Sequence, residues 1–332
     1  MIEQLRAPFP YFGGKSSVAA LVWQRFGNVA NYVEAFFGSG AVLLGRPHEP
    51  GIESINDADG FVSNFWRAVQ ADPDAVCSAM DWPVNERDLA ARHYWLVTEG
   101  CERVAALQGD PLGYDAQVAG WWCWGLCSWI GSGWCNGEGP WQWRGGAWQK
   151  REVPVEAGIN RKRPHLGGSG GGVSINSGAA GDLRQWIFAL SQRLRRVRVT
   201  CGDWSRVCGP SVTFKHGLTG IFLDPPYSAE AGRTSDLYAV DCLSVAHDVR
   251  AWCIANGGNK KLRICLAGYD GEHAMPDGWE CVAWRTQGGY GNQGDDIGRD
   301  NAAREVLWFS PHCLAAHAPQ YRMDFATMGA IA

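Results

Sequence analysis

In the first part of the chain, the spacing of the apolar residues alternates between that of strands and that of helices. Mainly apolar runs at 32–36 and 52–55 predict buried strands. Helically spaced apolar residues follow Ser16 and Ser17, which are suited to cap a helix, and start again near Asp59. Because strands and helices alternate, we expect an α/β fold with a mostly parallel sheet and helices on both of its faces.

This alternation stops near residue 72 and returns near residue 183. Residues 72–110 look helical, whereas residues 111–181 contain eight tryptophans between Trp121 and Trp148 and fit no doubly wound sheet. Five further strands are predicted at 197–201, 221–223, 262–267, 280–285 and 305–309. We therefore predict a seven-stranded sheet in one domain formed by residues 1–71 and 183–315, an inserted helical and loop-rich region at 72–182, and a tail at 316–332.

Composition narrows the class of protein. Of the 332 residues, 46% are hydrophobic and 19% are charged, which is typical of a globular chain. No apolar run is long enough to cross a membrane, and the first residues lack the pattern of a signal peptide, so we expect a cytoplasmic protein without membrane contact. The twelve cysteines are too sparse for a disulfide scaffold, and the group Cys123, Cys127 and Cys135 lacks paired zinc-ligand spacing, so no metal is expected.

The distribution of charge is more informative than the net charge of −4. Between Arg144 and His165 there are six Lys or Arg residues and two Glu residues, a local excess of four positive charges. A basic face on an acidic body suits contact with phosphates, and an ordinary solvated surface is the alternative.

One apolar run ends in a distinctive turn. The strand predicted at 221–223 is followed by Asp224, Pro225, Pro226 and Tyr227. The prolines stiffen the turn and leave its carbonyl groups free of ladder hydrogen bonds. A carboxylate, a free carbonyl and an aromatic face are the groups needed to hold an exocyclic amino group and to stack its base. A simple strand-ending turn is the alternative.

Two other strand ends carry features of a nucleotide-type site. Phe36, Phe37, Gly38, Ser39 and Gly40 join a predicted strand to a helix, and such glycines let the backbone approach a ligand closely. The third glycine of the dinucleotide fingerprint is missing, which disfavours an NAD oxidoreductase. Asp57 ends the next strand, where an acid can accept both ribose hydroxyls, with a helix N-cap as the alternative.

Two shorter segments add candidate contacts. Gly13, Gly14 and Lys15 can place an ammonium group near a ligand carboxylate. Asp203 and Trp204 follow another strand, where the acid can accept from a purine amino group and the indole can stack on its ring. A simple turn and a capped turn are the respective alternatives.

In their order along the chain, these segments resemble the Dam-like, DPPY-type DNA adenine-N6 methyltransferases. That family has a GGK segment, an F-x-G-x-G loop, an acid after the second strand, a recognition insertion, a G-D-aromatic turn and a D-P-P-Y turn in this sequence. The resemblance spans about residues 8 to 309 and departs at Ala35, where a proline is usual. It implies a Rossmann-like S-adenosylmethionine-dependent methyltransferase fold in which residues 72–182 are an inserted target-recognition module.

The resemblance also implies a function and a set of site residues. The protein would move a methyl group from S-adenosylmethionine to the N6 amino group of a flipped-out adenine in duplex DNA, with Asp224, Pro225, Pro226 and Tyr227 as the catalytic turn. The cofactor would be contacted by Tyr11, Gly13, Gly14, Lys15, Glu34, Phe36, Phe37, Gly38, Ser39, Gly40, Asp57, Asp203, Trp204 and Asp224.

The same interpretation predicts the partners of the protein and leaves alternative functions open. Phosphates of duplex DNA would be contacted by Lys150, Arg151, Arg161, Lys162 and Arg163. Tryptophans of the insertion either pack as a small satellite core or expose rings that wedge or stack at the DNA. A cognate restriction endonuclease is a possible partner. The alternative functions are a cytosine-N4 or RNA methyltransferase and a catalytically silent DNA-binding module.

Overall fold

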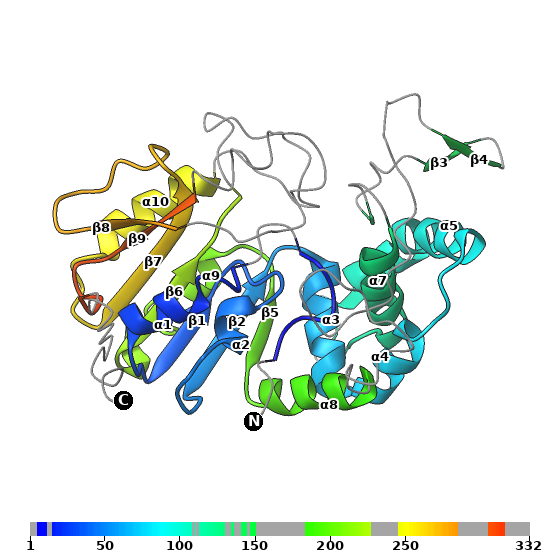
Figure 1. The fold of residues 1–332 in the computed structure, drawn as a ribbon, viewed down its shortest axis with the longest axis horizontal. Helices are drawn as coiled ribbons and strands as arrows, with labels where there is room; N and C mark the ends of the chain where they lie inside the picture. The colour runs from blue at the N-terminus through cyan, green and yellow to red at the C-terminus, as the bar shows by residue number, and fades with distance from the viewer. Residues whose placement is uncertain are drawn as a thin grey trace, which may run out of the picture.

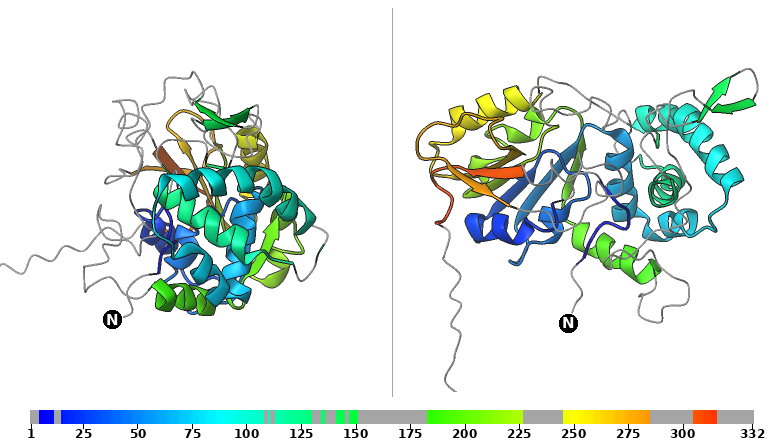
Figure 2. Two further views of the ribbon diagram at one scale, coloured as in Figure 1. Left: turned by 90° about the vertical axis from the view of Figure 1, so that its right-hand side faces the viewer. Right: turned by 45° about the horizontal axis from the view of Figure 1, so that its top comes forward.

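The fold is a central sheet between helices, with a further helical region beside one sheet edge (Figures 1 and 2). The computed structural model describes residues 5–11, 15–107, 110, 113–129, 134–135, 183–226, 245–284 and 305–315, together with the backbone of 141–144 and 147–150.

The sheet has seven strands in the order β5-β2-β1-β6-β7-β9-β8. Their bounds are β1 Asn31–Glu34, β2 Ile52–Asp57, β5 Arg198–Cys201, β6 Thr219–Leu223, β7 Leu262–Tyr269, β8 Glu280–Ala283 and β9 Glu305–Phe309. The pairs from β5 to β7 are parallel, but β9 is antiparallel to both β7 and β8. The sheet is therefore mixed, which corrects the prediction of a mostly parallel one. Apolar pattern locates a strand without giving its direction.

Each predicted strand is present near its predicted position, and helices cover both faces of the sheet. The helices that flank it are α1 Ala19–Phe26, α2 Ala41–Leu44, α3 Gly60–Ala71, α8 Leu183–Leu194, α9 Ser205–Cys208 and α10 Val245–Asn256, with a 3-10 turn at Phe214–His216. Neighbouring residues of β1 take part in different cores: Tyr32 packs with α1, and Val33 packs with α9 and α10. Burial on both faces explains why β1 is mainly apolar rather than alternating.

The start of α1 differs from the prediction. Its N-cap residue is Val18, and no side chain caps the helix. Instead, the Lys15 carbonyl accepts hydrogen bonds from the backbone N–H groups of Val18 and Ala19. The predicted capping by Ser16 or Ser17 is wrong, and Lys15 is held at the first turn of the helix.

Residues 72–128 form helices that continue the main core. They are α4 Pro73–Met80, α5 Glu86–Trp95, a π-helical turn Leu96–Gly100, α6 Cys101–Ala106 and α7 Ala116–Ser128, and the backbone of β3 Trp141–Arg144 and β4 Ala147–Lys150 forms an antiparallel hairpin. Val76 of α4 and Val118 of α7 belong to the same apolar cluster as Phe65 of α3. The described helices of residues 72–128 are thus no separate module, and the boundaries near residues 72 and 182 stay predictions.

Four tryptophans between residues 121 and 148 pack inside the protein, whereas Trp82 is 44% exposed. Trp122, Trp124, Trp129 and Trp134 are buried in the main apolar cluster. These four rings therefore pack, as one of the two alternatives predicted, although they join the main core instead of a satellite core. The side chains of Trp141, Trp143 and Trp148 lie outside the described part.

None of the helices described by the structure combines the length and the apolar character that crossing a membrane requires.

Candidate functional site

Four parallel strands end together at one edge of the sheet. The Phe37 N–H that follows β1 donates to the Asn56 carbonyl of β2, and the Gly202 N–H that follows β5 donates to the Asp57 carbonyl. Ala35 N–H donates to the Phe222 carbonyl of β6, just before the turn that carries Asp224. The carboxyl ends of β1, β2, β5 and β6 are therefore fixed against one another. In open α/β sheets this edge is where ligands bind.

Asp224 is paired with a buried lysine at this edge. Its Oδ2 lies 2.9 Å from Lys15 Nζ, and Glu305 Oε2 lies 3.8 Å from the same nitrogen. The Lys15 side chain is only 4% exposed, and Glu305 is 12% exposed. Lys15 thus stands between two carboxylates that come from different parts of the chain. The sequence predicted Lys15 and Asp224 as site residues, and the structure brings them together; Glu305, whose only signal is an acid directly before an apolar run, was not predicted beside them.

The opposite charges of Lys15 and the two carboxylates affect the pKa values of Lys15 and Glu305. Burial alone lowers the pKa of Lys15, but the carboxylates of Asp224 and Glu305 outweigh burial, so its pKa is raised. Burial raises the pKa of Glu305, and Asp224 raises it further while Lys15 opposes both effects. Removing Lys15 would take away the positive charge that lies between the two carboxylates.

The loop after β1 takes a shape that requires glycine. Gly38 has φ +46° and Gly40 has φ +64°, in the left-handed region that side chains disfavour. A Cβ on Gly38 would lie 2.4 Å from the Tyr11 ring, and one on Gly40 would lie 2.4 Å from the Phe37 ring. Trp66 Nε1 donates to the Gly38 carbonyl at 2.9 Å, which anchors the loop to α3.

Asp57 faces this glycine loop from the end of β2. Its Oδ2 accepts the Gly38 N–H, and its Oδ1 accepts the Asp59 N–H, both at 2.9 Å. Burial, and after it the neighbouring Asp59, raise the pKa of Asp57 to about 7. The N-cap of α3 is Asp59, which accepts from Phe61 N–H, so Asp57 does not cap that helix. Its carboxylate instead ties the second strand to the loop.

Glu34 lies behind the loop rather than at its surface. Its Oε2 accepts the Tyr32 hydroxyl at 2.8 Å and the Leu43 N–H of α2 at 3.1 Å, and the residue is buried. Burial raises the pKa of Glu34 to about 8, although both hydrogen bonds oppose this shift. Glu34 therefore holds the helix that follows the glycine loop, and direct contact with a cofactor stays a prediction.

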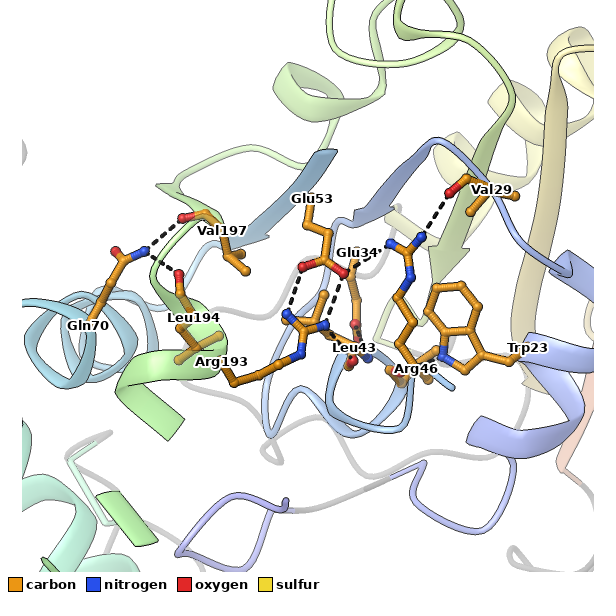
Figure 3. Close-up of polar contacts among 11 residues, drawn as sticks. Trp23, Val29, Glu34, Leu43, Arg46, Glu53, Gln70, Arg193, Leu194 and Val197 are labelled. Carbon is orange, nitrogen blue, oxygen red and sulfur yellow. Dashed lines mark hydrogen bonds and ion pairs between the residues drawn. The ribbon is translucent and has the colours of Figure 1, made fainter. Parts of the chain in front are cut away.

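A buried ion network, unforeseen in the sequence, supports the same helix (Figure 3). Glu53 of β2 accepts from Arg46 Nη1 at 3.0 Å and from Arg193 Nη1 and Nη2 at 2.7 and 2.9 Å. Arg193 also donates to the Leu43 carbonyl, and Arg46 donates to the Val29 carbonyl. The network joins α2, β2 and α8. Arg193 lies 140 residues from Glu53 in the sequence, so no local pattern predicts the network.

Asp203 and Trp204 lie at the end of β5. Asp203 Oδ1 accepts from the Ser205 N–H at 2.9 Å and from the Ser205 hydroxyl, as a capped turn requires. The Trp204 ring stacks on Phe36 with centroids 6.4 Å apart and meets Trp252 edge-on. Trp204 thus lies beside the loop after β1, while contact of either residue with a cofactor stays a prediction.

Several predicted site residues fall outside the described part. They are Gly13, Gly14, Tyr227, Arg151, Arg161, Lys162 and Arg163, and Lys150 is described only by its backbone in β4. Their roles stay predictions.

Comparison with known proteins bears on the first part of this site. Residues 11–102 match the model of the family described as D12 class N6 adenine-specific DNA methyltransferase. The match covers Tyr11, Lys15, the glycine loop and Asp57, and ends before Asp224. No curated protein matches the chain. The resemblance to the Dam-like DNA adenine-N6 methyltransferases, first indicated by the order of the motifs, is thus confirmed by a family match over residues 11–102.

Proposed function

We propose that this protein transfers a methyl group from S-adenosylmethionine to the N6 amino group of an adenine flipped out of duplex DNA. The single observation that carries the proposal is the position of Asp224. Its carboxylate follows the central strand β6 and lies at the same edge of the sheet as the glycine loop and Asp57. The family match supports adenine rather than cytosine-N4 or RNA as the target.

The donor set at this edge fits the cofactor. When bound, S-adenosylmethionine supplies a methyl group on a positively charged sulfonium. The two Asp57 oxygens each accept one backbone N–H, and a carboxylate oxygen has a second lone pair that can accept a ribose hydroxyl. The glycine loop, Asp57, Asp203 and Trp204 would hold the nucleoside part, and Tyr11 would line the loop, since its ring packs against Gly38.

Asp224 and Pro225 would act on the nucleophile. An adenine amino group is a poor nucleophile because its lone pair is delocalised into the ring. Hydrogen bonds from its two N–H groups to the Asp224 carboxylate and the Pro225 carbonyl would favour a pyramidal nitrogen with a directed lone pair. Bound S-adenosylmethionine would supply the methyl group that this lone pair receives, and its sulfur would keep the electrons of the former bond to that group. The extra proton on N6 then passes to Asp224 and on to water. Positioning provides most of the acceleration.

The target base must leave the duplex to reach this edge. Extrusion costs a few kcal/mol. Stacking of the base on Tyr227 would offset roughly 1–3 kcal/mol of that cost. Phosphate contacts by Lys150, Arg151, Arg161, Lys162 and Arg163 would position the DNA without specifying its sequence. A cognate restriction endonuclease and a cytoplasmic location remain expectations.

The direct test is transfer of labelled methyl groups to unmethylated duplex DNA, followed by digestion to nucleosides. We expect label in N6-methyladenine with the wild-type protein and none with Asp224→Ala. Asp74→Ala is the matched control, because Asp74 pairs with Arg184 on an exposed helix surface and should leave transfer unchanged. Label in N4-methylcytosine, or full transfer by folded Asp224→Ala, would contradict the proposal.

A further inference from the structure

We propose that Asn56 is a positioning residue that fixes the glycine loop and the turn of Asp203 and Trp204 relative to one another, so that both bind the same cofactor molecule. This inference rests on the proposed function. It assigns a role in cofactor binding to a side chain that is only 1% exposed and lies behind the candidate site.

The first step is the place of Asn56 in the sheet. It is the residue before Asp57 in β2, and β2 lies between β1 and β5. The ladder with β1 ends at Glu34, and the ladder with β5 ends at Cys201. Because β1 and β5 are not neighbours in the sheet, these ladders alone do not hold the segments that follow them against each other.

The second step is that the Asn56 amide joins these two segments. Its Nδ2 donates to the Ala35 carbonyl at 3.1 Å and to the Gly202 carbonyl at 2.9 Å. Both carbonyls belong to peptide groups just beyond the ladders, and these peptide groups lead into Phe36 and Asp203. One side chain therefore connects the start of the glycine loop to the start of the turn.

The third step is that these contacts require an amide. The two carbonyl oxygens can only accept, so the NH2 group has to face them, and Oδ1 on the other side accepts the Thr200 hydroxyl at 3.0 Å. An Asp side chain has the same shape but would turn an oxygen towards both carbonyls. Because a buried polar group without a partner destabilises a fold, the three contacts hold the Asn56 side chain in one orientation.

The fourth step is what the joined segments carry. The Asn56 carbonyl also accepts the Phe37 N–H at 3.0 Å, so this residue holds the glycine loop through both its backbone and its side chain. The rings of Phe36 and Trp204 stack with centroids 6.4 Å apart, one from each segment. A nucleoside held by both segments meets them at once, so its affinity depends on their spacing.

The test measures two affinities of each folded variant. One is the affinity for S-adenosylhomocysteine, measured by calorimetry, and the other is the affinity for duplex DNA without cofactor. Asn56→Asp removes both donors but keeps the oxygen that accepts from Thr200. The first affinity reports the spacing of the two segments, and the second reports damage to the protein as a whole.

We expect Asn56→Asp to weaken S-adenosylhomocysteine binding about tenfold, roughly the size of one lost hydrogen bond, with the affinity for duplex DNA unchanged. Asn31→Asp is the matched control. Asn31 is equally buried, and its Nδ2 also donates to two carbonyls, those of Val212 and Thr213. However, it begins β1 and so lies at the opposite edge of the sheet. This control should leave both affinities unchanged.

Thr200→Val provides a milder variant. It removes the hydroxyl that orients the Asn56 amide but leaves both amide donors in place. We expect it to weaken S-adenosylhomocysteine binding by less than Asn56→Asp, about threefold, again with unchanged affinity for duplex DNA.

Other outcomes overturn the inference. An unchanged affinity for S-adenosylhomocysteine in folded Asn56→Asp would show no positioning role. A parallel loss of DNA affinity, or the same loss in Asn31→Asp, would show a merely structural one. If Asn56→Asp does not fold, Thr200→Val decides, since an unchanged cofactor affinity or a parallel loss of DNA affinity contradicts the proposal. A wild-type protein that binds no S-adenosylhomocysteine would refute the proposed function and the inference with it, which distinguishes the two failures.

Discussion

Lys15 and Asp224 form an ion pair of 2.9 Å that joins the segment before α1 to the turn after β6. Replacing Lys15 with Met would leave Asp224 and Glu305 without the cation that stands between them. The pKa of Glu305, already raised by burial and Asp224, would then rise further because Lys15 no longer opposes that shift.

We therefore expect Lys15→Met to slow methyl transfer at neutral pH by tenfold or more, roughly the scale of a displaced catalytic charge. With the pKa of Glu305 raised further, this carboxyl ionises only at higher pH, so the optimum should move upward. Initial rates from about pH 6 to about pH 9 measure this. An unchanged pH profile with a reduced rate would mean that Lys15 acts on the cofactor alone.

Gly38→Ala should damage the glycine loop. Alanine at φ +46° is strained, and its Cβ would meet the Tyr11 ring at 2.4 Å. We expect a loss of about 1–3 kcal/mol in the free energy of unfolding. The rise in melting temperature on adding S-adenosylmethionine should also shrink, which thermal unfolding measures in the same experiment.

Gly209→Ala is the control for this substitution. Gly209 has φ −72° and open space around its Cβ position. It should change stability and the cofactor response little. Equal effects at Gly38 and Gly209 would count against a special role for the loop.

Glu53→Leu should destabilise the protein strongly. Glu53 is 2% exposed and is the carboxylate partner of Arg46, which is equally enclosed, and of Arg193 (Figure 3). Removing it leaves two poorly hydrated guanidinium groups, at a cost of about 3–5 kcal/mol. Urea unfolding measures this cost.

Asp74→Asn provides the comparison for that network. The pair between Asp74 and Arg184 is exposed on both sides, so its loss should change the free energy of unfolding by less than about 1 kcal/mol. Similar costs for the two substitutions would show that burial of the Glu53 network contributes little.

Glu34→Gln should change how stability depends on pH. In the folded protein the pKa of Glu34 is raised from 4.5 to about 8, so the folded state holds this proton more tightly than the unfolded state. The resulting stability is complete below about pH 4.5 and is lost as pH rises through about 8. Glutamine cannot titrate, so the variant should lose less stability across this window. Parallel curves of unfolding free energy against pH would contradict the expectation.

Much of the fold and part of the site could be predicted from local pattern. Runs of apolar residues located the strands, and the acid and glycines at their ends located Asp224, Asp57 and the loop after β1. What failed depends on contacts between distant segments. The spacing of apolar residues does not show the direction of a strand, so the antiparallel direction of β9 was not predicted.

The residues that support the candidate site could not be predicted from the sequence for the same reason. Glu53 meets Arg46 and Arg193 only after α2, β2 and α8 have packed together. Glu305 is a single acid before an apolar run, a pattern shared with many strands that carry no function. Nothing in the sequence distinguishes it until β9 is placed beside β7.

Because β9 runs antiparallel to β7, its first residue rather than its last lies at the edge of the sheet that carries the candidate site. At the edge of the sheet where the parallel strands end, a parallel strand places its last residue and an antiparallel strand places its first. Glu305 therefore lies opposite Tyr269, the final residue of β7. One extra residue inside β9 would turn every later side chain to the opposite face. The place of this acid at the edge of the sheet is therefore set by the register of β9 against β7.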